Sequence, residues 1–180
     1  MREELATPDG YSLRPWTSDD VDAVLAAFRP AEMLRQAGGR PIDTPELAKA
    51  WIAATARGWR EDSGYAWAVL DAAGAVVGNA LVNSIDRRHG TGWVSYWTVP
   101  AGRGRGAATA ATSALAGWAL SDLGLFRLEL GHRTDNPASC RVASEAGFAV
   151  EGLERSKLLY DGVRYDVELH ARLATDPVTA

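Results

Sequence analysis

The sequence predicts a protein of the α/β (α+β) class, with one mixed, twisted sheet of six to seven strands flanked by about four helices. Two observations lead to this class. Along the 180 residues, the hydrophobic pattern changes repeatedly between the two-residue period of strands and the 3.6-residue period of helices. In the middle of the chain, a strand, a glycine-rich loop, a helix and another strand follow one another. Such a unit is a natural place for a cofactor.

The first three elements are a strand and two helices. Gly10–Trp16 has the composition of a short strand. Ser18 is a candidate N-cap, since the two acidic residues after it suit the positive end of a helix dipole, and this helix should end near Phe28. Arg29–Thr44 has prolines, paired glycines and no clear period, which indicates a mobile connection. Proline at a favoured first-turn position then opens a helix over Pro45–Arg60.

The remaining elements alternate between strands and helices. The expected strands are bounded by turn residues, and they are Tyr65–Leu70, Val76–Ile85, Gly92–Val99, Phe126–Leu130, Phe148–Leu159 and Arg164–Leu173. One helix leaves the glycine-rich loop and ends near Leu123, and another spans Asn136–Ala146. Asp161-Gly162 predicts a hairpin between the last two strands. We expect a single domain over residues 1–174 and a polar tail over 175–180.

Composition narrows the possible functions. The chain is 47% hydrophobic and 23% charged, as ordinary globular proteins are. A net charge of −4 argues against a dedicated nucleic-acid binder. Cys140 is the only cysteine and the three histidines are scattered, so we expect no disulfide and no metal. Met1–Gly10 lacks the apolar stretch of a signal peptide, and no segment resembles a membrane helix, so we expect a cytoplasmic protein without a membrane partner.

The loop from Arg103 to Thr109 is the most informative segment. Three glycines in Gly102–Gly106 let a backbone approach a ligand closely, and the loop leads directly into a helix. The first amides of a helix have no partner inside it, so with the helix dipole they form an anion site suited to a pyrophosphate. A glycine-rich turn with two solvated arginines is the alternative interpretation. The loop fits neither the P-loop pattern nor the full dinucleotide-binding pattern.

Arg103, Gly106 and Ala108 fit the pattern R-x-x-G-x-A. This pattern resembles the acyl-CoA signature of the GNAT N-acetyltransferase superfamily. Several flanking motifs agree with it in order, namely Tyr96-Trp97-Thr98-Val99-Pro100 before it and Leu123–Leu130, Asp135–Ser139, Ala146–Phe148 and Glu151-Gly152 after it. Together they resemble the RimJ/RimL branch, the ribosomal-protein-alanine N-acetyltransferases, from about Val77 to Leu173.

The resemblance implies a GNAT-like acyl-CoA N-acyltransferase fold, with acetyl-CoA as co-substrate between the strands Gly92–Val99 and Phe126–Leu130. Backbone edges, loop amides and one asparagine would bind the cofactor. These residues are Thr98, Val99, Arg103, Gly104, Arg105, Gly106, Ala107, Ala108, Thr109 and Asn136. Ser139 matches a serine that lies near the thioester sulfur and can protonate the leaving thiolate.

The general base is left open by the sequence. Some family members carry a glutamate where this chain has Leu158. The base could lie elsewhere, act through water, or be unnecessary for an amine of low pKa. Tyr96, Glu129, His132 and Asp166 are the candidates, although His132 also fits a solvated loop histidine. Cys140 is interpreted as structural or incidental, because GNAT transfer usually proceeds without a covalent enzyme intermediate.

The resemblance therefore predicts an enzyme that transfers an acetyl group directly to a primary amine, most readily a protein or peptide N-terminal amine. A small-molecule amine such as an antibiotic, polyamine or amino acid is the alternative acceptor. A catalytically weak CoA-binding sensor or interaction module, and a nucleotide-binding domain of another class, are further alternatives. An edge strand or the C-terminal hairpin could mediate a homodimer.

Overall fold

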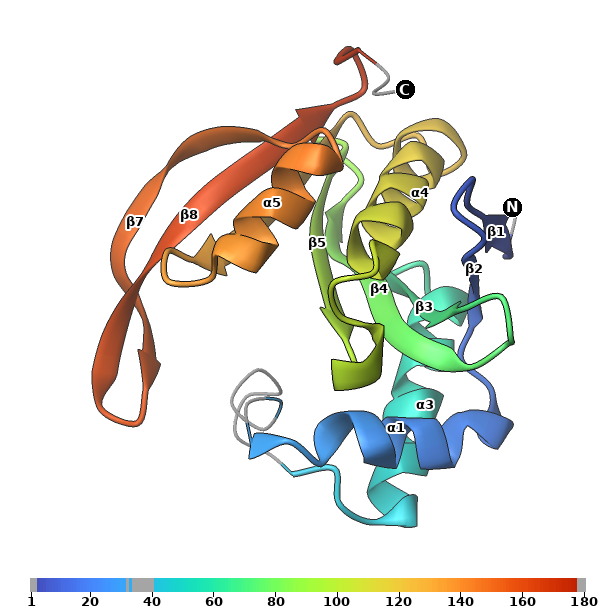
Figure 1. The fold of residues 1–180 in the computed structure, drawn as a ribbon. Coiled ribbons are helices and arrows are strands. Elements are labelled where there is room, and N and C mark those ends of the chain that lie inside the picture. Colours follow the sequence, from blue (N-terminus) through green and yellow to red (C-terminus); the bar gives the residue numbers. More distant parts are fainter. Residues whose placement is uncertain (1–2, 32, 34–40, 178–180) are drawn as a thin grey trace.

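The computed structural model describes residues 3–31, 33 and 41–177, and its eight strands form one sheet in the order β1-β2-β3-β4-β5-β6-β8-β7 (Figure 1). The strands are β1 (Leu5–Ala6), β2 (Ser12–Pro15), β3 (Gly64–Leu70), β4 (Val76–Asp86), β5 (Thr91–Thr98), β6 (Arg127–Arg133), β7 (Ala149–Tyr160) and β8 (Val163–Leu173). The helices are α1 (Val21–Phe28), α3 (Pro45–Arg60), α4 (Ala107–Ser121) and α5 (Pro137–Glu145). None of these helices is long and apolar enough to cross a membrane.

The predicted fold class is confirmed, with one strand more than the six to seven expected. The additional strand, β1, has two residues and is too short to show an alternating pattern. Ser18 is not the N-cap: the cap of the short 3₁₀ turn at Ser18–Asp20 is Thr17, which forms a capping box with Asp20. Residues 32 and 34–40 of the expected connection lie outside the described residues.

The sheet is covered on both faces, and β3 shows how the sequence assigns each face. Its alternating residues Tyr65, Trp67 and Val69 belong to one core with residues of α4, such as Trp118. The residues between them, Ala66, Ala68 and Leu70, belong to a second core with α1 and α3. Both sides are apolar, and β3 is therefore a continuous hydrophobic run rather than an alternating one.

Two tryptophans of α3 have structural roles. Trp51 packs edge-on against Trp16, with ring centroids 5.0 Å apart, and lies in the second core. Trp59 packs against Trp67 at 4.8 Å, and its indole Nε1 donates to the Ala66 carbonyl at 3.1 Å. β2 pairs with β3 only from Trp67 to Leu70, so the Ala66 carbonyl has no partner in β2. The Trp59 indole supplies a donor to it. Both residues therefore contribute to core packing.

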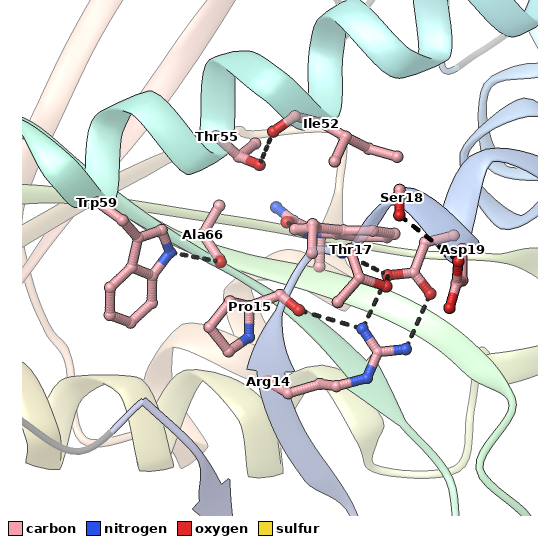
Figure 2. A network of polar contacts seen from close by, with 12 residues as sticks. Arg14, Pro15, Thr17, Ser18, Asp19, Ile52, Thr55, Trp59 and Ala66 are labelled. Atoms are coloured by element: carbon pink, nitrogen blue, oxygen red, sulfur yellow. Dashed lines mark hydrogen bonds and ion pairs between the residues drawn. The ribbon is translucent and has the colours of Figure 1, made fainter.

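An ion pair between the half-buried Arg14 and the buried Asp20 fixes the passage from β2 to α1. The Arg14 guanidinium donates to both carboxylate oxygens of Asp20, at 2.7 and 2.8 Å, and to the Pro15 carbonyl (Figure 2). The Thr17 amide donates to the same carboxylate at 2.8 Å. Burial acts to raise the pKa of Asp20, but the bonds from Arg14 and Thr17 outweigh it and hold the pKa below its usual value.

Replacing Asp20 with alanine is expected to lower the free energy of unfolding at pH 7 by about 2 kcal/mol, because it removes the carboxylate that accepts from Arg14 and from the Thr17 amide. Asp20 has a depressed pKa in the folded state, so its contribution is complete above the unfolded pKa of about 4 and fades as pH falls through the folded pKa. Urea denaturation at pH 7 and at about pH 3 measures this difference. The exposed neighbour Asp19→Ala is the control, with an expected change within about 0.5 kcal/mol. A difference between wild type and Asp20→Ala that is unchanged at the lower pH would contradict the assignment.

Candidate functional site

The site begins where β5 and β6 diverge. These strands are parallel, and they pair only from Thr91 to Trp93 and from Arg127 to Glu129. Beyond Trp93, the edge of β5 that faces β6 has no strand partner in the described residues, whereas the other edge of β6 stays paired with β8 as far as Arg133. Figure 1 shows the β7–β8 hairpin standing well apart from β4 and β5.

Alternation along β5 determines which backbone groups face this gap. The Val99 amide donates to the Val77 carbonyl at 3.0 Å, on the β4 side, so it is not available as a donor at the gap. Neighbouring residues of a strand direct their backbone groups to opposite sides, so Val94, Tyr96 and Thr98 face the gap. Of the two backbone positions that the family resemblance implied, Thr98 faces the gap and the N–H of Val99 does not.

The glycine-rich loop closes one end of the gap. Gly104 and Gly106 have φ values of +69° and +82°, which glycine adopts without strain. The Ala110 amide makes the first bond within α4, to the Gly106 carbonyl at 2.9 Å. The amides of residues 107–109 therefore precede the first intrahelical bond and can donate to an anion. Tyr11 steadies the loop, since its hydroxyl donates to the Arg105 carbonyl at 2.7 Å.

A cleft of about 680 Å³ lies between this loop, β5 and α5. Ten of the predicted residues line it, namely Tyr96, Thr98, Arg103, Gly104, Gly106, Ala107, Ala108, Thr109, Asn136 and Ser139. The other two predicted cofactor residues, Val99 and Arg105, are not among its lining residues. The sequence interpretation missed Arg141 and Glu145, which line the cleft from α5. Their position depends on the packing of α5 beside α4, for which the sequence has no local signal.

The start of α5 forms the junction of the site. The Asn136 side-chain oxygen caps the helix by accepting from the Ser139 amide at 3.2 Å, and Pro137 occupies the first turn. With its oxygen used in this way, the Asn136 carboxamide still has two N–H donors. Tyr96 reaches across from β5, and its hydroxyl donates to the Ser139 carbonyl at 3.1 Å. Burial raises the pKa of Tyr96, so the phenol keeps its proton and is not a base.

A second cleft, of about 460 Å³, continues from the first on the other side of this junction. Tyr96, Asn136 and Ser139 line both clefts. The second cleft is also lined by Val94, Ser95, Leu130, Gly131, His132, Arg133, Leu158 and Tyr160. Its described lining therefore includes one arginine and no carboxylate.

The structure places two candidate bases away from the clefts. Glu129 forms an ion pair with Arg127, at 2.6 Å, and lines neither cleft. Asp166 accepts from the Ser156 amide at 2.7 Å, where β7 bulges, and also lines neither cleft. Leu158, in the position of the family glutamate, does line the second cleft. The described residues thus bring no carboxylate to the junction as a general base.

The interpretation of His132 as a solvated loop histidine is wrong. His132 lies in β6, is 8% exposed, and its Nε2 is 3.0 Å from Nε2 of the buried His170. Its Nδ1 is 2.9 Å from the Arg133 carbonyl, so both ring nitrogens face other protein groups, which argues against His132 as the base. Sequence inspection missed this pair because it depends on the pairing of β6 with β8.

The Cys140 thiol lies 3.4 Å from the Glu168 carboxylate. The carboxylate raises the pKa of the thiol, which argues against Cys140 as a nucleophile.

Comparisons with known proteins agree with this architecture. The uncharacterized N-acetyltransferase YoaA of Bacillus subtilis is 27% identical over 164 residues, which cover 91% of this chain and 93% of YoaA. RimJ of Mycobacterium smegmatis, solved in complex with CoA-disulfide, matches with a TM-score of 0.80 at 22% identity, over 95% of this chain and 86% of RimJ. A spermidine N-acetyltransferase chimera of Vibrio cholerae SpeG and hSSAT matches with a TM-score of 0.79 at 17% identity, over 92% and 96% of the two chains. At these identities the two structures establish the fold alone.

The family itself is shown by sequence. The acetyltransferase (GNAT) domain family matches residues 12–149, which is most of the chain and includes β5, the glycine-rich loop and α5. The divergent strands, the helix N-terminus and the loop signature lie within this match. The chain therefore belongs to the GNAT acetyltransferase family and is an N-acetyltransferase of that type.

Proposed function

We propose that the protein transfers the acetyl group of acetyl-CoA directly to the α-amine of a peptide or protein N-terminus. One observation carries the proposal. Two clefts meet at Tyr96, Asn136 and Ser139. The first leads to the N-terminus of α4. Among the described residues that line the second, none carries a carboxylate. The first suits a CoA thioester, and the second suits a neutral amine acceptor.

The first cleft offers partners for each part of acetyl-CoA. The pyrophosphate would accept from the amides of residues 107–109 at the positive end of α4, with Arg103 and Arg141 adding charge. The pantetheine arm would lie along β5, where Thr98 and Tyr96 direct backbone groups to the gap. Asn136 would donate an N–H to one of its carbonyls. The CoA bound in the RimJ structure supports this assignment through the shared fold.

The thioester would then lie at the junction of the clefts. The amine nitrogen attacks the thioester carbonyl carbon, a C–N bond forms, the C–S bond breaks, and the amine loses a proton while the CoA thiolate gains one. The Ser139 hydroxyl is the proton donor at this place, and the Tyr96 phenol, which donates to the Ser139 carbonyl, positions that residue.

The missing carboxylate favours an α-amine as the acceptor. An α-amine has a pKa of about 8, so about a tenth of it is neutral at pH 7, whereas about one lysine-type amine in 2,500 is neutral. An α-amine can therefore react without a protein base. A polyamine carries several positive charges, and the described lining of the second cleft offers it Arg133 and no acidic side chain. A CoA-binding module without turnover is the second candidate, favoured by Leu158 at the position of the family glutamate.

The cofactor assignment is tested by Gly106→Ala, with Gly74→Ala as the matched control. Both glycines have φ near +80° and open space where a Cβ would lie, so both variants should lose about 1 kcal/mol of stability. Saturating acetyl-CoA should raise the melting temperature of wild type and Gly74→Ala by about 5–10 °C. In Gly106→Ala, where the methyl group enters the cleft, most of this shift should be lost. ATP should give no comparable shift. A full acetyl-CoA shift in Gly106→Ala would contradict the assignment of the loop.

Replacing Ser139 with alanine should lower kcat about 100-fold, because it removes a proton donor at the junction. Acetyl-CoA binding should change less than about twofold, since the β-carbon remains and the backbone amide of residue 139 still donates to the Asn136 cap of α5. Initial rates of CoA release and the acetyl-CoA melting shift measure these quantities. Ser121→Ala, at the far end of α4, is the control and should retain the wild-type kcat. An unchanged kcat in Ser139→Ala would remove its hydroxyl from the chemistry.

The acceptor is tested with two forms of one peptide. The first has a free α-amine and no lysine, and the second has a formylated N-terminus and one lysine. We expect kcat/KM at pH 7 to be about 100-fold higher for the free α-amine, and to rise with pH until about pH 8 as the amine becomes neutral. Spermidine is the small-molecule comparison. Preferred acetylation of spermidine would overturn the assigned acceptor, and CoA binding without turnover on any of the three would favour the binding module.

A further inference from the structure

Four side chains that the acetyl transfer does not use meet beneath α5. His132 comes from β6, Cys140 from α5, and Glu168 and His170 from β8. His132 stands opposite Glu168 in the antiparallel ladder, and His170 lies two residues further along β8 on the same face. The cluster therefore joins three elements at a single point behind the junction of the clefts.

The potential donor atoms of this cluster are close together. His170 Nε2 lies 3.0 Å from His132 Nε2 and 3.0 Å from Glu168 Oε1. His132 Nε2 lies 3.3 Å from the same carboxylate oxygen, and Cys140 Sγ lies 3.4 Å from it. All four atoms lie within 4.8 Å of one another.

The carbonyl groups at the far side of each ring leave the Nε2 atoms free to bind a cation. His132 Nδ1 faces the Arg133 carbonyl at 2.9 Å, and His170 Nδ1 faces the Phe148 carbonyl at 3.3 Å. A carbonyl only accepts, so a hydrogen on each Nδ1 satisfies both contacts and leaves a lone pair at each Nε2. In this tautomer, two lone pairs and a carboxylate oxygen converge within 3.3 Å, and a cation among them would stabilise the arrangement.

We propose that His132, Cys140, Glu168 and His170 form a structural Zn²⁺ site. With zinc–nitrogen and zinc–oxygen bonds of about 2.0–2.2 Å and a zinc–sulfur bond of about 2.3 Å, tetrahedral ligands are about 3.3–3.6 Å apart. The four contacts of 3.0–3.4 Å are close to this spacing, and a closer approach of Cys140 to the histidines would complete it. Thiolate and imidazole ligands favour zinc over magnesium or calcium.

The surroundings of the cluster fit such a site. Zinc-bound histidines usually donate their second N–H to a backbone carbonyl or a carboxylate, and both histidines here face a carbonyl. The His170 side chain is fully buried and that of His132 is 6% exposed, whereas that of Glu168 is 30% exposed and gives an ion a way in. Four protein ligands close the coordination sphere, so the metal would be structural rather than catalytic.

The site would position the junction of the clefts. Cys140 follows Ser139 directly in α5, and His132 forms part of the wall of the second cleft. A metal that joins α5 to β6 and β8 would fix Ser139 relative to the gap beside β5. This proposal replaces the expectation from the sequence that the chain holds no metal.

The test uses the full chain without a histidine tag. We expect wild type to bind about one equivalent of zinc per chain, measured by elemental analysis after dialysis under reducing conditions. Chelation should lower its melting temperature by about 5–10 °C. His170→Gln should lose the zinc, and the exposed His89→Gln should retain it. Zinc retained by His170→Gln, or wild type that binds none after addition of zinc, would overturn the site.

Cobalt substitution keeps the test independent of whether His170→Gln folds. Co²⁺ bound to wild type should give the visible bands of a tetrahedral site and a near-ultraviolet band from charge transfer between thiolate and cobalt. In Cys140→Ala the charge-transfer band should disappear while circular dichroism shows a folded protein. A charge-transfer band that persists in Cys140→Ala would place the metal elsewhere and overturn the proposal.

Discussion

The short parallel ladder between β5 and β6 is the feature on which the rest of the site depends. Three paired residues from each strand hold the two halves of the sheet together, and beyond them β6 follows β8 while β5 follows β4. Gly92 stands within this ladder, where an added Cβ would lie 2.9 Å from side-chain atoms of Val82 and Leu125. The tight packing at the ladder and the divergence beyond it leave one strand edge of β5 with donors and acceptors for a ligand.

Closing this gap requires elements from both halves of the sheet. On the β5 side, the phenol of Tyr96 reaches across to the Ser139 carbonyl. On the other side, α5 is held by its Asn136 cap and by the polar cluster that links Cys140 to β6 and β8. The helix therefore belongs to the cofactor cleft, the acceptor cleft and the histidine cluster at once, and a displacement of α5 would change all three together.

Local signals predicted the features that depend on neighbouring residues in the chain. Pro45 predicted the start of α3, which spans the expected Pro45–Arg60, and Gly104 and Gly106 predicted the loop before α4. Features formed between distant segments were not predictable in this way. His132 and His170 are 38 residues apart and meet only because β8 inserts between β6 and β7. Arg141 enters the cleft through the packing of α5 on α4. Glu129 is a different case, because the alternation of β6 already places it on the face opposite Leu128, Leu130 and His132.

The acceptor is the least predictable property of the site, because different elements would bind the cofactor and the acceptor. In the proposed function, acetyl-CoA would be held by backbone amides of α4 and β5, whose positions follow from the fold and vary little with side-chain identity. The acceptor would lie among side chains such as Leu158 and Tyr160, which come from β7 at the edge of the sheet. An edge strand packs against one neighbour only, so substitutions there change the acceptor cleft without disturbing the ladder between β5 and β6. In the proposed function, Leu158 in place of a glutamate is such a change: it would remove a charge from the second cleft, leave the junction at Ser139 intact, and shift the choice of acceptor toward amines that are neutral near pH 7.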